Sequence, residues 1–320
     1  MQYLSYQQSE QVPNIIVDGA SNAGTELELS HWPNSTTPEP LKADLSAEIV
    51  FNYLANPEFK VTAKVVSNDH FDADGLVGIY TLLHPDDAED LKEMLIDIAG
   101  AGDFNVYRDR EAARVSFILD AWQNPKLSPL KASIFAQAYP SVANILYEEL
   151  LPRFARIIEK VGYLEKYWKA QDDLLEDSEQ ALRKRHFKLT ELPELDLAIV
   201  AMPDANVGPS QSIHRMAIHN QTNCMRILLM QETNFELYFR YETWVEYQSR
   251  QTSPRIDLQD LAGSLSKQES MDGVWSFGGI NDLTPTLRLT GDSQSKIPFE
   301  SFRSQVLEFL TQRQAKIQFN

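Results

Sequence analysis

The first third of the chain alternates between short apolar runs and segments with helical spacing. Apolar runs that end in polar turns predict strands at Asn14–Asp18, Glu26–Trp32 and Lys60–Val66. Apolar residues three and four positions apart predict helices over Lys42–Leu54, Leu76–Leu83, Asp86–Ala99 and Arg110–Trp122. The first eleven residues are polar, and we expect them to be loosely held. Because alternating strands and helices are typical of parallel sheets, we predict an α/β domain over residues 12–127.

The middle of the chain, residues 128–186, has a helical pattern almost throughout and is predicted to be a helical connector. Charged residues are dense here, and a break is expected near Pro152 because proline interrupts a helix. Tyr163, Leu164, Tyr167 and Trp168 follow helical spacing, which favours a buried stripe of core residues.

After Phe187 the pattern changes to one rich in strands. Strands are predicted at Asp196–Met202, Ser212–His219, Met225–Met230, Phe235–Tyr247, Val274–Phe277 and Thr286–Leu289. Helices are expected over Leu258–Lys267 and from about Pro298 onward. We therefore predict an open, mainly parallel sheet with flanking helices in the first domain, and a smaller α/β domain over residues 187–320.

Charge narrows the classes of partner. The chain carries 46 acidic and 29 basic residues, a formal net charge of -17, which disfavours long nucleic acids and anionic membranes. Its single cysteine, Cys224, excludes an internal disulfide and a cysteine-built metal site. Neither a secretory signal nor a membrane-length apolar run is visible, so a cytoplasmic protein is expected. Whether the chain forms a homodimer is left open.

The most informative segment is His70–Gly75, which reads H-F-D-A-D-G. Alternate side chains of an extended chain share a face, so His70, Asp72 and Asp74 are expected to point the same way where the third strand ends. An imidazole with two carboxylates favours Mn²⁺ or Mg²⁺ over Zn²⁺. A calcium loop of the EF-hand kind is excluded, since its twelfth position would be Thr81. The alternative that the acids only cap a helix stays open.

His70–Gly75 resembles motif I of the DHH phosphoesterase superfamily, H-x-D-x-D-G after a first strand. Asn14–Gly19 resembles that family's strand-end Asp motif, and Leu29–Pro33 occupies the place of its DHH triplet. Ala43–Val50 is similar to the helix start that follows, where Asp44 or Ser46 is the expected N-cap. These segments keep the family's order but precede motif I, which indicates a circularly permuted DHH-like domain.

The resemblance implies a set of site residues. Implied metal ligands are Asp18, His70, Asp72 and Asp74, and implied catalytic residues are Asp72, Asp74 and His31. The DHH triplet is reduced to Ser30–Trp32, which lacks one acid and one histidine, so the number of metal ions is open. Asp103 could replace the missing acid, although a helix-end turn is the role that its context favours.

The second domain is similar to the accessory domains that follow DHH domains. Tyr247–Arg250 and Trp275–Gly279 resemble the accessory domain's arginine element and its glycine-rich motif, without the histidine that usually follows the glycines. The resemblance implies that phosphate is held by Arg240, Arg250, Gly278 and Gly279. A surface or interface role for the two arginines stays open.

We therefore predict a divalent-metal-dependent phosphoesterase or phosphoanhydride hydrolase that acts on a small phosphorylated or nucleotide substrate. A bound Mn²⁺ or Mg²⁺ would lower the pKa of a water that attacks phosphorus. The alternative is a catalytically inactive DHH-like protein that binds metal or nucleotide as a sensor or interaction module. Either hypothesis requires one spatial result, the convergence of Asp18, His31, His70, Asp72 and Asp74.

Overall fold

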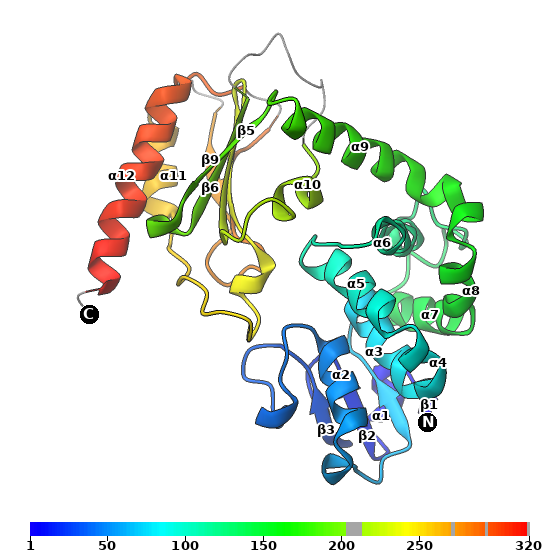
Figure 1. Ribbon diagram of the computed structural model, residues 1–320. Helices are drawn as coiled ribbons and strands as arrows, with labels where there is room; N and C mark the ends of the chain where they lie inside the picture. Colours follow the sequence, from blue (N-terminus) through cyan, green and yellow to red (C-terminus); the bar gives the residue numbers. More distant parts are fainter. Residues whose placement is uncertain (203–212, 270–272, 292–293, 319–320) are drawn as a thin grey trace. The chain divides into compact units, whose positions relative to one another are not determined.

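A computed structural model describes residues 1–202, 213–269, 273–291 and 294–318 (Figure 1). Its contacts divide the chain into two compact units. The first unit comprises Met1–Leu174 together with Val245–Gln251, and the second comprises Leu175–Trp244 together with Thr252–Asn320. The second unit is thus interrupted by a short segment that belongs to the first.

A four-stranded parallel sheet forms the centre of the first unit. Its strands are β1 (Gln2–Tyr3), β2 (Asn14–Val17), β3 (Thr25–Leu29) and β4 (Val65–Ser67), in the order β1-β4-β2-β3. The helices of this half are α1 (Tyr6–Ser9), α2 (Ser46–Ala55), α3 (Ala73–Leu83), α4 (Pro85–Asp90), α5 (Lys92–Asp103) and α6 (Arg110–Gln123). All four residues of β2 are buried, as expected for a strand covered on both faces. The predicted α/β class is confirmed.

Two local predictions in this unit were wrong. The first residues are not loose, because Gln2 and Tyr3 pair with Val65 and Val66 of β4. This pairing uses main-chain groups, so the polar side chains gave no sign of it. The helix predicted over Asp86–Ala99 is two helices, α4 and α5, which are interrupted at Leu91.

The predicted helical region contains α7 (Tyr139–Leu150), α8 (Phe154–Glu159) and α9 (Glu165–Arg183), with 3-10 turns η3 (Leu151–Arg153) and η4 (Val161–Leu164) between them. The break expected near Pro152 is confirmed, since α7 ends at Leu150. Asp172 of α9 holds α6 through two arginines: it lies 2.5 Å from Arg110 Nε and 3.0 Å from an Arg114 guanidinium nitrogen.

The second unit contains a mixed six-stranded sheet. Its strands are β5 (Lys188–Leu192), β6 (Leu197–Met202), β7 (Arg226–Gln231), β8 (Asn234–Phe239), β9 (Trp275–Phe277) and β10 (Thr286–Leu289), in the order β5-β6-β7-β8-β10-β9. Its helices are α10 (Arg215–His219), α11 (Gln259–Ser266) and α12 (Phe299–Gln318). Short 3-10 turns elsewhere are η1 (Glu39–Leu41), η2 (Pro57–Phe59), η5 (Pro193–Leu195) and η6 (Tyr241–Thr243). Side chains of α11 and α12 pack on the sheet as one apolar core.

The strand predicted over Ser212–His219 was wrong where the structure describes it. Ser212 lies outside the described residues, and Arg215–His219 forms α10. His214 caps this helix, since its Nδ1 accepts the Met216 N–H at 3.1 Å. The strand predicted over Phe235–Tyr247 is shorter than expected. It ends at Phe239, and the 3-10 turn η6 begins two residues later, at Tyr241.

Candidate metal centre

Three polar residues follow three neighbouring strands at their carboxyl ends. Asp18 follows β2 directly, His31 lies two residues beyond β3, and His70 lies three residues beyond β4. Asp18 turns the chain out of its strand with a φ of 53°, in the left-handed region that aspartate tolerates better than most residues. Because carboxyl ends of parallel strands meet at one edge, the three side chains are gathered there.

The start of α3 supplies two more acids to the same edge. Asp72 is the N-cap, and its Oδ1 accepts the Gly75 N–H at 2.8 Å. Asp74 lies in the first turn and is buried. The expected extended alternation of these residues was wrong beyond Asp72, because the helix already begins at Ala73. His70, Asp72 and Asp74 nevertheless lie at the same edge of the sheet, as expected.

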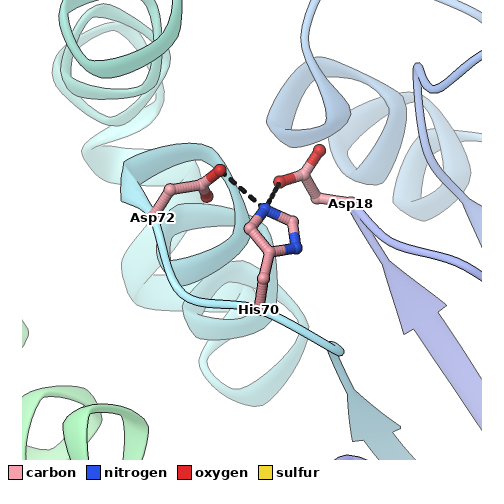
Figure 2. Close-up of side chains that lie close together, drawn as sticks. All are labelled: Asp18, His70 and Asp72. Atoms are coloured by element: carbon pink, nitrogen blue, oxygen red, sulfur yellow. Dashed lines mark hydrogen bonds and ion pairs between the residues drawn. The ribbon is translucent and has the colours of Figure 1, made fainter. Parts of the chain in front are cut away.

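Asp18, His70 and Asp72 form one group of candidate metal ligands (Figure 2). His70 Nε2 lies 2.8 Å from Asp72 Oδ2 and 3.4 Å from Asp18 Oδ2. The candidate ligand atoms all lie within 4.8 Å of one another. The His70 and Asp72 side chains are 21% and 31% exposed, so solvent reaches this group from their side.

Asp18, His31 and Asp74 form a second candidate group, and this one is fully buried. His31 Nε2 lies 3.3 Å from Asp18 Oδ1 and 3.9 Å from Asp74 Oδ2. Asp18 therefore belongs to both groups and presents a different oxygen to each. A carboxylate placed in this way is suited to bridge two cations.

Asp103, the last residue of α5, is an acid whose role sequence reasoning underestimated. Its Oδ2 is buried, lies 3.6 Å from His31 Nε2, and makes no hydrogen bond among the described residues. Asp18 Oδ2 is likewise buried and, apart from its ion-pair contact with His70 Nε2 at 3.4 Å, has no hydrogen-bond partner within the described part of the chain. Such orphaned carboxylate oxygens fit a cation, because buried polar atoms are otherwise almost always paired. The sequence offered one sign of this role, the glycine before Asp103. Gly102 lets α5 lie close to α3, because a Cβ at this position would lie only 2.5 Å from the Ala73 Cβ.

A second set of contacts orients both histidines. His31 Nδ1 lies 2.6 Å from the carbonyl oxygen of Asp44. Because a carbonyl only accepts, Nδ1 carries the proton, and Nε2 faces the carboxylates as a lone pair. His70 Nδ1 similarly lies 3.0 Å from Asp69 Oδ1. Backing of this kind is what histidine ligands of metals usually have.

The amino end of α2 fixes the acids. Asp74 Oδ2 accepts the Ser46 N–H and Oδ1 accepts the Ala47 N–H, both at 2.7 Å. The Ser46 hydroxyl donates to Asp18 Oδ1 at 2.8 Å. The expected cap by Asp44 or Ser46 was therefore wrong: Leu45 occupies the N-cap position, and Asp74 caps the helix from α3. A carboxylate at a helix amino terminus is also favoured by the helix dipole.

Burial and mutual repulsion hold protons on this cluster. Burial, with the charges of Asp18 and Asp72, raises the pKa of Asp74 well above its usual value. Burial and nearby aspartates do the same to the pKa of Asp103, and burial and Asp72 raise the pKa of Asp18. For His70, burial disfavours the charged ring, but Asp72 and neighbouring hydrogen bonds outweigh it and raise the pKa. A divalent cation would displace these protons.

Mn²⁺ affinity is expected to fall as pH falls, by up to about tenfold per pH unit for each proton displaced. The cation requires ionised carboxylates, whereas the raised pKa values of Asp18, Asp74 and Asp103 favour their protonated forms in the metal-free fold. Titration calorimetry across pH would measure this slope. A Mn²⁺ affinity that does not change with pH would contradict the inference that the metal-free carboxyl groups hold protons.

The effect on stability has the same origin. The pKa values of Asp74 and Asp103 are higher in the folded protein than in the unfolded chain. Their contribution to the stability of the metal-free fold is therefore fully present at pH values below the usual aspartate pKa. It is lost as the pH rises through the raised pKa values, because the buried carboxyl groups then ionise. The stabilisation of the protein by Mn²⁺, read as a difference in melting temperature with and without metal, should therefore grow with pH. The Asp18→Asn variant is the control, and its difference should stay small at every pH.

The four residues predicted to hold substrate phosphate are divided between the units. Arg240 is buried in the second unit, where it donates to the Thr222 carbonyl at 2.9 Å and pairs with Glu242. Gly278 and Gly279 follow β9 there, and Gly279 has a φ of 112°. Arg250 belongs to the first unit. Phosphate binding by any of them stays a prediction.

Val245–Gln251 attaches to the first unit beside His31. The Glu246 N–H donates to the His31 carbonyl at 2.8 Å, and the Gln248 N–H donates to Asp44 Oδ1 at 2.6 Å. Asp44 thus backs His31 with its carbonyl and holds this segment with its carboxylate. Arg250 lies two residues beyond Gln248.

The fold and the cluster define an α/β protein with a buried Asp/His group that could hold a metal ion. The chain belongs to the DUF6687 family, a family of unknown function whose model matches residues 1–320. No curated protein and no solved structure matched the chain. Because this family has no known function, the match does not indicate an activity. The DHH resemblance therefore depends only on the sequence motifs described above. Among the described residues, no helix combines the length and apolar character needed to cross a membrane.

Proposed function

We propose that this protein is a divalent-metal-dependent hydrolase of phosphoester or phosphoanhydride bonds, with a small phosphorylated or nucleotide substrate. One observation carries the proposal: two candidate ligand groups share Asp18 at the carboxyl edge of a parallel sheet. Paired cations at such an edge suit hydrolysis at phosphorus, because one can orient the attacking oxygen and the other the leaving oxygen. The residues that resemble the DHH phosphoesterase motifs, although they occur in a permuted order along the chain, support the same activity.

The donor set favours Mn²⁺ or Mg²⁺. Carboxylates outnumber imidazoles in the cluster, and hard oxygen ligands suit these cations. Cys224 belongs to the second unit and is buried, so no thiolate joins the cluster. Two imidazoles, His31 and His70, shift the preference from Mg²⁺ toward Mn²⁺, which accepts nitrogen more readily.

The chain's own residues have distinct parts in the proposed reaction. Asp18, with His70 and Asp72, would hold the cation on the more exposed side, where substrate can reach it. A bound cation would supply Lewis-acid chemistry, lowering the pKa of water and neutralising charge on the phosphate. Asp69 keeps the His70 ring oriented through Nδ1. Arg250 is proposed to pair with the substrate phosphate, as guanidinium groups commonly do.

Asp72→Asn is expected to lower Mn²⁺-dependent phosphate release by about 100-fold or more, because it removes a charged ligand from the more exposed group. Release would be measured on a panel of nucleotides, dinucleotides and polyphosphate. Asp173→Asn is the matched control, since Asp173 pairs with Lys169 on the exposed face of α9. Full activity in Asp72→Asn would exclude this site.

A second function, a metal sensor without catalysis, is favoured by one observation. The triplet position is Ser30–Trp32, and the Trp32 ring lies 5.1 Å from the His70 ring on the more exposed side of the cluster. A large ring there restricts the space for a substrate. Tight Mn²⁺ binding with no phosphate release from any member of the panel would support the sensor over the hydrolase.

A further inference from the structure

A cavity in the first unit lies among helices and is lined by none of the metal-cluster residues. Its volume is about 590 Å³, within the range of pockets that hold small molecules. Its lining residues belong to the end of α6, to η3, α8 and η4, and to the start of α9. Its basic and aromatic lining residues are Trp122, Arg153, Arg156, Lys160, Tyr163 and Tyr167.

The cavity's charge is opposite to that of the chain as a whole. Arg153, Arg156 and Lys160 are spaced three and four residues apart, which places them on one side of the helical segment. The segment from Leu151 through Lys169 contains five basic and only two acidic residues, although acids outnumber bases in the full sequence. Arg153 pairs with Glu149 and Lys160 pairs with the exposed Glu159, whereas Arg156 has no ion pair among the described residues. An anionic ligand is the complement of this lining.

The aromatic lining residues are not part of the core. Tyr163 is 87% exposed, while the neighbouring Trp168 is buried and donates Nε1–H to the Val161 carbonyl at 2.8 Å. The predicted buried stripe was therefore correct for Trp168 and wrong for Tyr163. The Tyr163 N–H donates to the Lys160 carbonyl at 2.9 Å, so the turn that presents this ring is held by the main chain. The Tyr163 ring offers an exposed aromatic face on which a planar ring can stack, whereas Tyr167 is half-buried and Lys166 Nζ lies 4.5 Å from the centre of its ring.

We propose that this cavity binds a nucleotide, with the base against Tyr163 and the phosphates on Arg156 and Lys160. A nucleotide joins a flat aromatic ring to a multiply charged anion, which is the combination that the lining complements. Tyr rings offer stacking surface at small entropic cost, and guanidinium groups bind phosphate oxygens in pairs. This site is independent of the proposed hydrolytic function.

The test uses ADP, adenosine and pyrophosphate as probes of the full chain, by titration calorimetry in EDTA. Chelation keeps the metal cluster from capturing phosphate, so failure here is separable from failure of the proposed hydrolase. We expect ADP to bind at least about tenfold more tightly than either part alone, because stacking and charge both contribute. Tyr163→Ala and Arg156→Glu should each weaken ADP binding by about tenfold or more.

Controls match each substitution in kind. Leu127→Ala removes an exposed apolar side chain outside the cavity, and Lys131→Glu reverses an exposed charge in the same unit. Both should leave ADP affinity unchanged, as should Asp72→Asn in the metal cluster. The proposal is overturned if ADP fails to bind, if pyrophosphate binds as well as ADP, or if Tyr163→Ala and Arg156→Glu bind ADP like the unchanged protein.

Discussion

Asp18→Asn is expected to remove metal binding at both candidate groups, with affinity for Mn²⁺ falling by at least about 100-fold. The side chain presents Oδ1 to His31 and Oδ2 to His70, so one change of charge reaches the whole centre. The amide keeps the size of the carboxylate and one oxygen for the Ser46 hydroxyl. It also removes a buried acid whose pKa is raised by burial and by Asp72, so the metal-free fold should be at least as stable as before.

The number of metal ions that each variant retains distinguishes a ligand shared by both groups from a ligand of one group. Asp72→Asn changes only the more exposed group and His31→Gln only the buried group, so each should leave one cation bound, whereas Asp18→Asn should leave none. Metal content of protein equilibrated with Mn²⁺ and desalted would be measured by elemental analysis. An Asp18→Asn protein that retains as much metal as the unchanged chain would contradict a bridging role.

Asp74→Ala is expected to destabilise the metal-free protein by about 2–4 kcal/mol. The Asp74 carboxylate accepts the N–H groups of Ser46 and Ala47, and its loss leaves two buried donors unpaired, at about 1–3 kcal/mol each. Part of that cost is returned because a buried acid with a raised pKa is removed. The net effect remains large because Ser46, Ala47 and Asp74 are all buried away from bulk solvent.

Urea unfolding in EDTA at neutral pH measures this free energy. Asp72→Ala is the comparison, because Asp72 caps α3 through a single backbone N–H, that of Gly75, and pairs with the partly exposed His70, so its loss should cost about 1–2 kcal/mol. Asp74→Asn, which retains one acceptor oxygen, should fall between the unchanged protein and Asp74→Ala. Equal stabilities for Asp72→Ala and Asp74→Ala would rule out a capping role for Asp74 across the two helices.

Much of the candidate site could be predicted from sequence, for a simple reason. Asp18 and His31 stand at the ends of two predicted strands and His70 follows a third, and strand ends in a parallel sheet share one edge. The segment from His70 to Gly75 also carries its chemistry in consecutive residues. The residue pattern alone placed His70, Asp72 and Asp74 together, whereas Asp18 and His31 were assigned to the site through the DHH resemblance.

Other parts of the site depend on contacts that no local pattern records. Asp103 ends a helix 29 residues after Asp74 and reaches the cluster only because Gly102 lets α5 pack against α3. The cap of α2 comes from Asp74, 28 residues along the chain. Short elements were also misread: the five-residue α10 carries too few turns to show helical spacing. Tertiary packing decides such features, and propensity does not.

The attachment of Val245–Gln251 to the first unit sets an order of assembly during synthesis. A ribosome releases residues 1–174 long before residue 251, so the nascent first unit must wait for its last segment. Until then the His31 carbonyl and the Asp44 carboxylate lack the partners that Glu246 and Gln248 later supply. The support behind one candidate metal ligand is therefore completed only after most of the second unit's sheet has been translated.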